Sequence, residues 1–183
     1  MGYPLLILGV AVFALAHLFK RLAPARRAQM GNSGRIIVTI AMFAGIILMV
    51  IGYRAAPVVQ LWNPPQFLNH VNNLLMLIAF WFFALSAIPG TMSARIRHKQ
   101  LTALKTWAIA HLLVNGDLAS LILFGGLLAW AVFSVIKIKR AEPEWERPAN
   151  ASVKNDIIAL GVAVVVMLVV GYIHGLLGYP VFG

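Results

Sequence analysis

Long, uninterrupted apolar runs occupy most of this 183-residue chain and set the strongest limit on its fold. Hydrophobic residues make up 61% of the sequence and charged residues 11%, whereas soluble domains contain about 45–50% apolar and about 25% charged residues. The runs do not alternate between polar and apolar positions as the strands of membrane barrels do. About 20 apolar residues are enough to span a bilayer as a helix. The sequence therefore predicts an all-α, polytopic integral membrane protein.

Cysteine content and charge exclude several classes of protein. The chain has no cysteine, which removes disulfides, thiolate metal sites, iron–sulfur clusters and covalent c-type haem. The formal net charge is +10, and in a soluble protein such a charge would point to nucleic acid. In a membrane protein it indicates basic loops on one side of the bilayer. We therefore expect membrane lipid, and no nucleic acid, as a partner.

One apolar stretch, residues 106–136, is too long for an ordinary crossing. As a single helix its 31 residues would extend for about 46 Å, compared with a hydrocarbon core of about 30 Å. Asn115-Gly116-Asp117 interrupts the stretch, and Asn-Gly and Gly-Asp are typical turn dipeptides. The stretch therefore either crosses the membrane once at an unusual length or turns back as a hairpin.

The basic residues of the loops decide between these two topologies. With one crossing, the 15 basic residues divide into nine on one side and six on the other, whereas a hairpin divides them into fourteen and one. Basic loops remain in the cytoplasm, so we predict the hairpin, with Asp117 as the N-cap of its second helix. The predicted protein is one membrane domain, 1–183, with both termini outside. Its six helices are expected at about 2–19, 36–53, 67–88, 100–115, 117–136 and 157–175.

Four of the five histidines, His17, His70, His111 and His174, lie inside predicted spans, and His98 lies in the basic segment RIRHKQ. Ionisable groups are costly in a bilayer, so each needs a hydrogen-bonding partner or a function. Zinc is disfavoured, because the chain has no cysteine, no HExxH and no acidic cluster. Haem b requires one or two neutral imidazoles on facing helices. The histidines therefore either hydrogen-bond within the bundle or ligate a haem.

Two of these histidines have surroundings suited to a haem. Each has small neighbours that would admit the ring, and each has an aromatic residue on the same helical face. The haem propionates need cationic partners, and we expect these to be Arg21, one turn after His17, and Lys105, near the start of the predicted fourth helix. Depth gives a different pairing, because two axial ligands must face one ring at similar depth. His17 lies near the inner end of its helix, and depth alone pairs His70 with His174 or His111. The flanking residues are Phe13, Ala14 and Ala16 at His17, and Trp107, Ala108 and Ala110 at His111.

The segment KTWAIAHLLVNGDLASLILFGG, residues 105–126, resembles the central motif of the NnrU family of bacterial membrane proteins. LNHVNNLLMLIAFWFFALSAIPG (68–90) and the early AHLFKRL also resemble that family. The basic segment RIRHKQ resembles the family's R-H-P segment, with Lys99 where proline is usual. The resemblance covers nearly the whole chain and implies a multi-pass protein of the bacterial inner membrane, linked to nitrite and nitric oxide metabolism in denitrification.

The family is also similar to the plant 15-cis-zeta-carotene isomerase, a membrane enzyme that uses haem b. This similarity implies that His17 and His111 are the axial ligands of a haem iron. His70, His174, His98, Asn115 and Asp117 then either hydrogen-bond around the haem ligands or are alternative ligands. The isomerase has a cysteine at the position of Ala108, which weakens a direct transfer of its activity to this chain.

Three functions remain open at this point. The first is a haem b protein of nitrogen-oxide metabolism that serves electron transfer or assembly with a redox partner. The second is a haem-dependent cis–trans isomerase of a polyene or isoprenoid, in which one axial ligand can leave the iron. The third is a cofactor-free membrane scaffold whose histidines bond to one another and to the asparagines.

Overall fold

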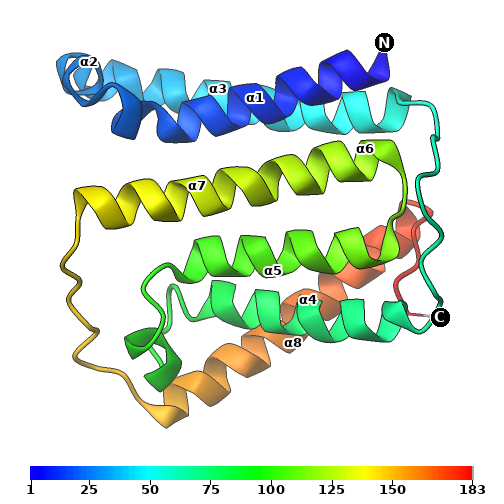
Figure 1. Ribbon diagram of the computed structural model, residues 1–183. Helices are drawn as coiled ribbons and strands as arrows, with labels where there is room; N and C mark the ends of the chain where they lie inside the picture. The colour runs from blue at the N-terminus through cyan, green and yellow to red at the C-terminus, as the bar shows by residue number, and fades with distance from the viewer. Residues whose placement is uncertain (183) are drawn as a thin grey trace. The chain divides into compact units, whose positions relative to one another are not determined.

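The computed structural model describes residues 1–182, and they form an all-helical protein (Figure 1). Within this range the only β-type pairing consists of two isolated bridges, Gln60 with Asp117 and Gly90 with Ser152. The helices are α1 (Gly2–Leu22), α2 (Pro24–Gln29), α3 (Gly31–Ala55), α4 (Leu68–Ala84), the 3₁₀ turn η1 (Thr91–Ala94), α5 (Lys99–Val114), α6 (Leu118–Ser120), the π-helical η2 (Leu121–Gly125), α7 (Gly126–Ala141) and α8 (Val153–Leu176).

Four helical segments of the described chain are long and apolar enough to cross a bilayer: Gly2–Leu22, Gly31–Ala55, Leu118–Ala141 and Val153–Leu176. Within a membrane a helix satisfies all of its own backbone hydrogen bonds, which explains why apolar runs of this length fold in this way. The predicted class, a helical membrane protein, is confirmed. α4 has 17 residues and α5 has 16, so the count of six spans stays a prediction.

The chain divides into two compact units. The first contains Met1–Asn63 and Asn115–Ala141, and therefore α1, α2, α3, α6, η2 and α7. The second contains Pro64–Val114 and the chain from Glu142 onward, and therefore α4, η1, α5 and α8. The single membrane domain expected from the sequence stays a prediction, as does the hairpin, because α5 and α6 belong to different units.

Glycines bring α1 and α3 of the first unit into close antiparallel contact. A Cβ atom built on Gly9 would lie 2.6 Å from the backbone nitrogen of Met49, and one on Gly45 would lie 2.9 Å from that of Phe13. On α7, a Cβ on Gly126 would approach a Val10 methyl of α1 to 2.8 Å. Small residues allow such approach between membrane helices, so Gly9, Gly45 and Gly126 are packing positions.

The interruption at Asn115-Gly116-Asp117 is held by the loop that follows α3. The carbonyl oxygen of Gly116 accepts from the backbone N–H of Leu61 at 2.7 Å and of Trp62 at 3.1 Å. A Cβ on Gly116 would overlap the carbonyl oxygen of Trp62. Glycine is therefore required here by the close approach of another backbone segment.

Asp117 is the N-cap of the helix that begins at Leu118, as predicted. Its carboxylate accepts from the backbone N–H of Ser120 at 2.9 Å and from the Ser120 hydroxyl at 2.6 Å. The Ser120 oxygen also lies 2.8 Å from the Tyr53 hydroxyl of α3. Asp117 thus has a structural role that fixes the start of α6 against α3.

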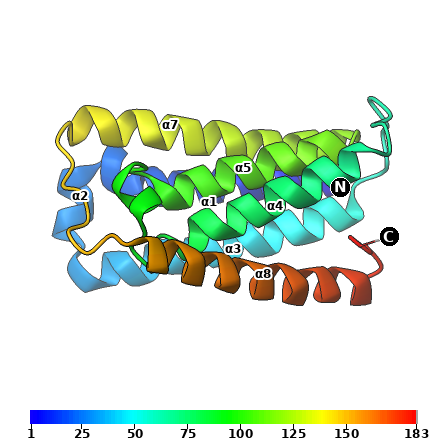
Figure 2. The ribbon, with the colours of Figure 1, turned by 90° about the horizontal axis from the view of Figure 1, so that it is seen from below.

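In the second unit, α4 packs against both α5 and α8, and Figure 2 shows it between them. The Trp81 indole N–H of α4 donates to the backbone oxygen of Asp156 on α8 at 3.1 Å. The Asp156 carboxylate accepts from the backbone N–H groups of Thr91 at 2.9 Å and Met92 at 3.3 Å, and from the Thr91 hydroxyl. This carboxylate therefore fastens η1 to the first turn of α8.

Candidate ligand cavity

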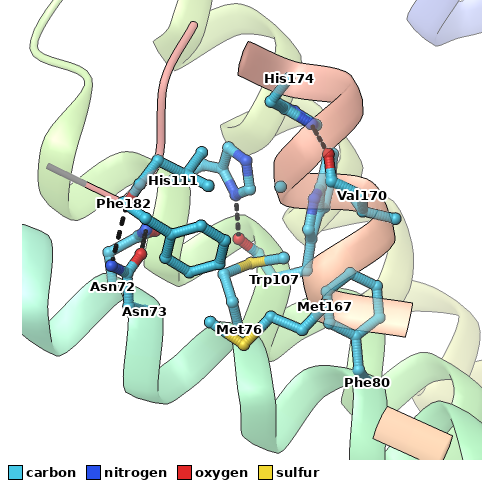
Figure 3. Close-up of a pocket in the computed structure, with 12 residues that line it drawn as sticks. Asn72, Asn73, Met76, Phe80, Trp107, His111, Met167, Val170, His174 and Phe182 are labelled. Carbon is cyan, nitrogen blue, oxygen red and sulfur yellow. Dashed lines mark hydrogen bonds between the residues drawn. The ribbon is translucent and has the colours of Figure 1, made fainter. Parts of the chain in front are cut away.

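The second unit contains a cavity of about 210 Å³, and Figure 3 shows the residues that line it. Three helices and the C-terminal segment contribute to its wall. α4, α5, α8 and the segment after α8 each contribute residues to the lining. The lining residues are Asn72, Asn73, Met76, Phe80, Trp107, His111, Met167, Val170, Gly171, His174, Val181 and Phe182.

Two of the predicted site histidines, His111 and His174, line this one cavity. Nδ1 of His111 lies 2.9 Å from the backbone oxygen of Trp107, and Nδ1 of His174 lies 2.9 Å from that of Val170 (Figure 3). A carbonyl oxygen only accepts hydrogen bonds, so each Nδ1 carries the proton. In the neutral imidazole, Nε2 is then the nitrogen that can accept a hydrogen bond or ligate a metal.

The rest of the wall is mostly apolar. Met76, Phe80, Met167 and Val170 provide thioether, aromatic and aliphatic surface. The Trp107 ring packs on the His111 ring with centroids 5.0 Å apart. A cavity of this kind, apolar with few polar groups, is the usual form of a site for a small molecule or a cofactor.

A chain of hydrogen bonds connects the C-terminal segment to α4 at the polar end. The Asn73 side chain donates from Nδ2 to the backbone oxygen of Val181 at 3.0 Å. The Asn72 side chain donates from Nδ2 to Oδ1 of Asn73 at 3.2 Å. The remaining amide oxygen, Oδ1 of Asn72, is buried and has no hydrogen-bond partner.

The C-terminal segment reaches the cavity through a reversal at the end of α8. Gly178 has a φ of +88°, a conformation that favours glycine, and the backbone N–H of Tyr179 donates to the oxygen of His174 at 2.8 Å. Gly171 leaves room for the Phe182 ring, which a Cβ at that position would overlap. This return of the chain was not predicted from the sequence, although Gly178 after α8 signals a reversal.

His17, the other proposed axial ligand, belongs to the first unit. Its Nδ1 lies 3.0 Å from the backbone oxygen of Phe13, so it has the same arrangement as His111 and His174. The ring packs on Phe13 with centroids 4.3 Å apart and on Trp130 of α7 with centroids 4.8 Å apart. Nε1 of Trp130 is buried without an acceptor, and sequence reasoning did not select this tryptophan.

The other predicted site residues lie outside the cavity lining. His70 is exposed near the start of α4. His98 and Lys105 are half-buried, at the residue before α5 and within α5 respectively. Arg21, also half-buried, lies in the last turn of α1. Asn115 and Asp117 lie at the break before α6, in the first unit.

Residues 1–182 contain no group of three or more histidine, cysteine, aspartate or glutamate side chains placed to hold a metal ion. A metal ion at the cavity would therefore need most of its ligands from a source other than these side chains. In haem, the porphyrin itself supplies four nitrogen ligands to the iron. The imidazoles of His111 and His174 are of the type that completes such a set.

Comparison with known proteins gives one match. No curated protein and no solved structure matches the chain. The family model described as NnrU protein matches residues 5–181, a range that includes every cavity-lining residue except Phe182, the break at Gly116 and all five histidines. The chain therefore belongs to the NnrU family of membrane proteins.

Proposed function

We propose that this chain is an NnrU-type integral membrane protein that binds haem b with His111 as an axial ligand, in the service of nitrite and nitric oxide metabolism. The observation that carries the proposal is the His111 imidazole. Its Nδ1–H is bonded to the Trp107 carbonyl, and its ring lies in an apolar cavity beside a second histidine of the same arrangement. The link to denitrification comes from the family resemblance.

The donor set fits a haem iron, because a metal-bound histidine usually donates its other N–H to a carbonyl or carboxylate. Two candidates exist for the second axial ligand. The resemblance favours His17, and the shared cavity favours His174. The cavity of about 210 Å³ is smaller than the usual ligand pocket of about 300–1,000 Å³. Haem binding therefore requires the lining side chains to move apart.

The protein's own groups would set the properties of the site. The bond from Nδ1 to the Trp107 carbonyl holds the His111 ring and makes Nε2 a better electron donor. Met76, Phe80 and Met167 would present apolar surface to the bound group. Arg21 and Lys105 are the proposed partners of the propionates. The haem itself would supply one-electron redox chemistry, and two histidine ligands would suit electron transfer.

A haem-dependent isomerase of a polyene or isoprenoid is the second candidate function. The apolar cavity favours it, since an apolar chain could enter beside the histidines. Isomerisation requires one axial ligand to leave, and this chain has Ala108 where the plant enzyme has a cysteine.

The third candidate is a scaffold without a cofactor. In a scaffold, the hydrogen bonds from Nδ1 to the helix backbone serve only to satisfy the imidazoles.

For the membrane topology we propose six spans in the bacterial inner membrane, with the basic loops in the cytoplasm and both termini outside. The distribution of basic residues supports this arrangement. Because the chain lacks cysteine, single cysteines placed at Asn32, Gln60 and Glu144 can be labelled in whole cells with an impermeant maleimide. Labelling should occur only at the Gln60 position, and labelling at the other two would contradict the topology.

Replacement of individual histidines tests the ligand assignment. With haem supplied during expression, His111→Ala should lose the sharp reduced α and β bands or convert to a high-spin spectrum. His70→Ala should keep the wild-type spectrum, because His70 is exposed and does not line the cavity. His17→Ala and His174→Ala decide which residue is the second ligand. An unchanged low-spin spectrum in His111→Ala would refute the assignment.

A further inference from the structure

We propose that the cavity of the second unit binds the head of a lipid alcohol, with the hydroxyl donating to Asn72. This inference goes beyond the haem proposal and does not require the haem. It rests on the orientation of the two asparagines, on the histidine tautomers, and on the size and surroundings of the cavity.

The asparagine orientations follow from one fixed acceptor. The Val181 carbonyl can only accept, so the amide group that faces it on Asn73 must be Nδ2. Oδ1 of Asn73 then faces Asn72 and must accept a hydrogen bond from Nδ2 of that residue. Oδ1 of Asn72 is therefore the end of the chain of hydrogen bonds. It is a buried oxygen without a donor, and a group of this kind in a native structure requires an explanation.

His174 adds a second acceptor to the same cavity. Its Nδ1–H is hydrogen-bonded to the Val170 carbonyl. Nε2 of the neutral ring can therefore accept a hydrogen bond but cannot donate one. A ligand that carries a carbonyl, an ester or a carboxylate would bring further acceptors to these groups. A hydroxyl supplies the donor that Asn72 lacks. The polar end therefore selects an alcohol over a ketone, an ester or an acid.

The remaining surface indicates that the alcohol belongs to a lipid. Met76, Phe80, Met167 and Val170 present apolar surface to the ligand. The cavity of about 210 Å³ holds only part of a long-chain molecule, and the apolar helices α4 and α8 leave large apolar side chains exposed around it, among them Leu74 and Ile173. The tail would therefore lie along these helices in the bilayer. Oδ1 of Asn72 is buried, so binding includes a small adjustment of the Asn72 side chain.

Competition against tritiated geranylgeraniol tests the proposal on the purified full chain in detergent, in haem-free and haem-supplied preparations. Unlabelled geranylgeraniol should compete about tenfold or more better than geranylgeranyl acetate, which has the same chain and no donor. Octadecanol distinguishes an isoprenoid alcohol from a fatty alcohol. Equal competition by the alcohol and its acetate would overturn the inference. Binding in the haem-free preparation tests the inference by itself. Weaker binding in the haem-supplied preparation would indicate that haem enters the same cavity.

A matched pair of variants on α4 locates the hydroxyl. Asn72→Leu should weaken geranylgeraniol binding by about tenfold to a hundredfold, and it should leave binding of the acetate unchanged. Asn69→Leu makes the same replacement one turn earlier at an exposed position outside the lining and should bind as wild type. Equal affinity of Asn72→Leu and Asn69→Leu for the alcohol would refute the assignment. If Asn72→Leu does not fold, the comparison of alcohol and acetate on the wild type still decides the question.

Discussion

Replacement of Gly116 by alanine should destabilise the first unit more than any other single methyl addition at a loop position. The new Cβ would overlap the carbonyl oxygen of Trp62 and lie 2.9 Å from Nε2 of Gln60. To avoid this overlap the two backbone segments must separate, and the bonds from Leu61 and Trp62 to the Gly116 carbonyl would be lost. We expect a loss of about 3 kcal/mol or more, and a fall of Tm by roughly 6–12 °C.

The control for this prediction is Gly161→Ala on α8. No heavy atom lies within 4 Å of a Cβ at that position, so alanine should stabilise the helix by about 0.5–1 kcal/mol. Thermal unfolding of both variants in the same detergent, followed by circular dichroism, gives the comparison. If Gly116→Ala melts with or above the wild type, the packing of the break against residues 59–62 is wrong.

Loss of the Asp156 carboxylate should loosen the attachment of η1 to α8 in the second unit. Asp156→Ala leaves the backbone N–H groups of Thr91 and Met92 and the Thr91 hydroxyl without their acceptor. Asp156, Thr91 and Met92 are each partly exposed, so water replaces the acceptor in part, and we expect a loss of about 1–2 kcal/mol. Hydrogen exchange should show reduced protection of the Thr91 and Met92 amides.

Two further variants separate geometry from charge at this position. Glu144→Ala removes the same charge from an exposed loop residue and should leave both the Tm and the exchange rates unchanged. Asp156→Asn keeps one acceptor oxygen and should give an intermediate loss. Unchanged protection of Thr91 and Met92 in Asp156→Ala would show that the carboxylate does not hold η1.

Local patterns were sufficient to predict several elements. Apolar runs of spanning length gave the helical class, and Asn115-Gly116-Asp117 gave the position of the break with Asp117 as the cap. These features depend on residues close together in the chain. The short helix α2 was not predicted, because its basic sequence PARRAQ is typical of a loop between two spans. The π-helical η2 was not predicted, because its residues are as apolar as the helix that follows.

Contacts between distant residues could not be predicted. Depth along each helix paired His70 with His111 or His174, but the structure places His111 and His174 on one cavity and leaves His70 exposed. Helix rotation decides which histidine faces the cavity, and a uniformly apolar helix contains little information about its rotation. The contacts of Asp156 with Thr91 and of Asn73 with Val181 also join segments more than 60 residues apart.

The most direct test of the central claim is the visible spectrum of the wild-type protein, purified in mild detergent from haem-supplied cells, before and after reduction with dithionite. The account predicts a Soret band with sharp reduced α and β bands, at about one haem b per chain. A folded preparation that carries no haem and takes up none when haemin is added would contradict it and leave the cofactor-free scaffold.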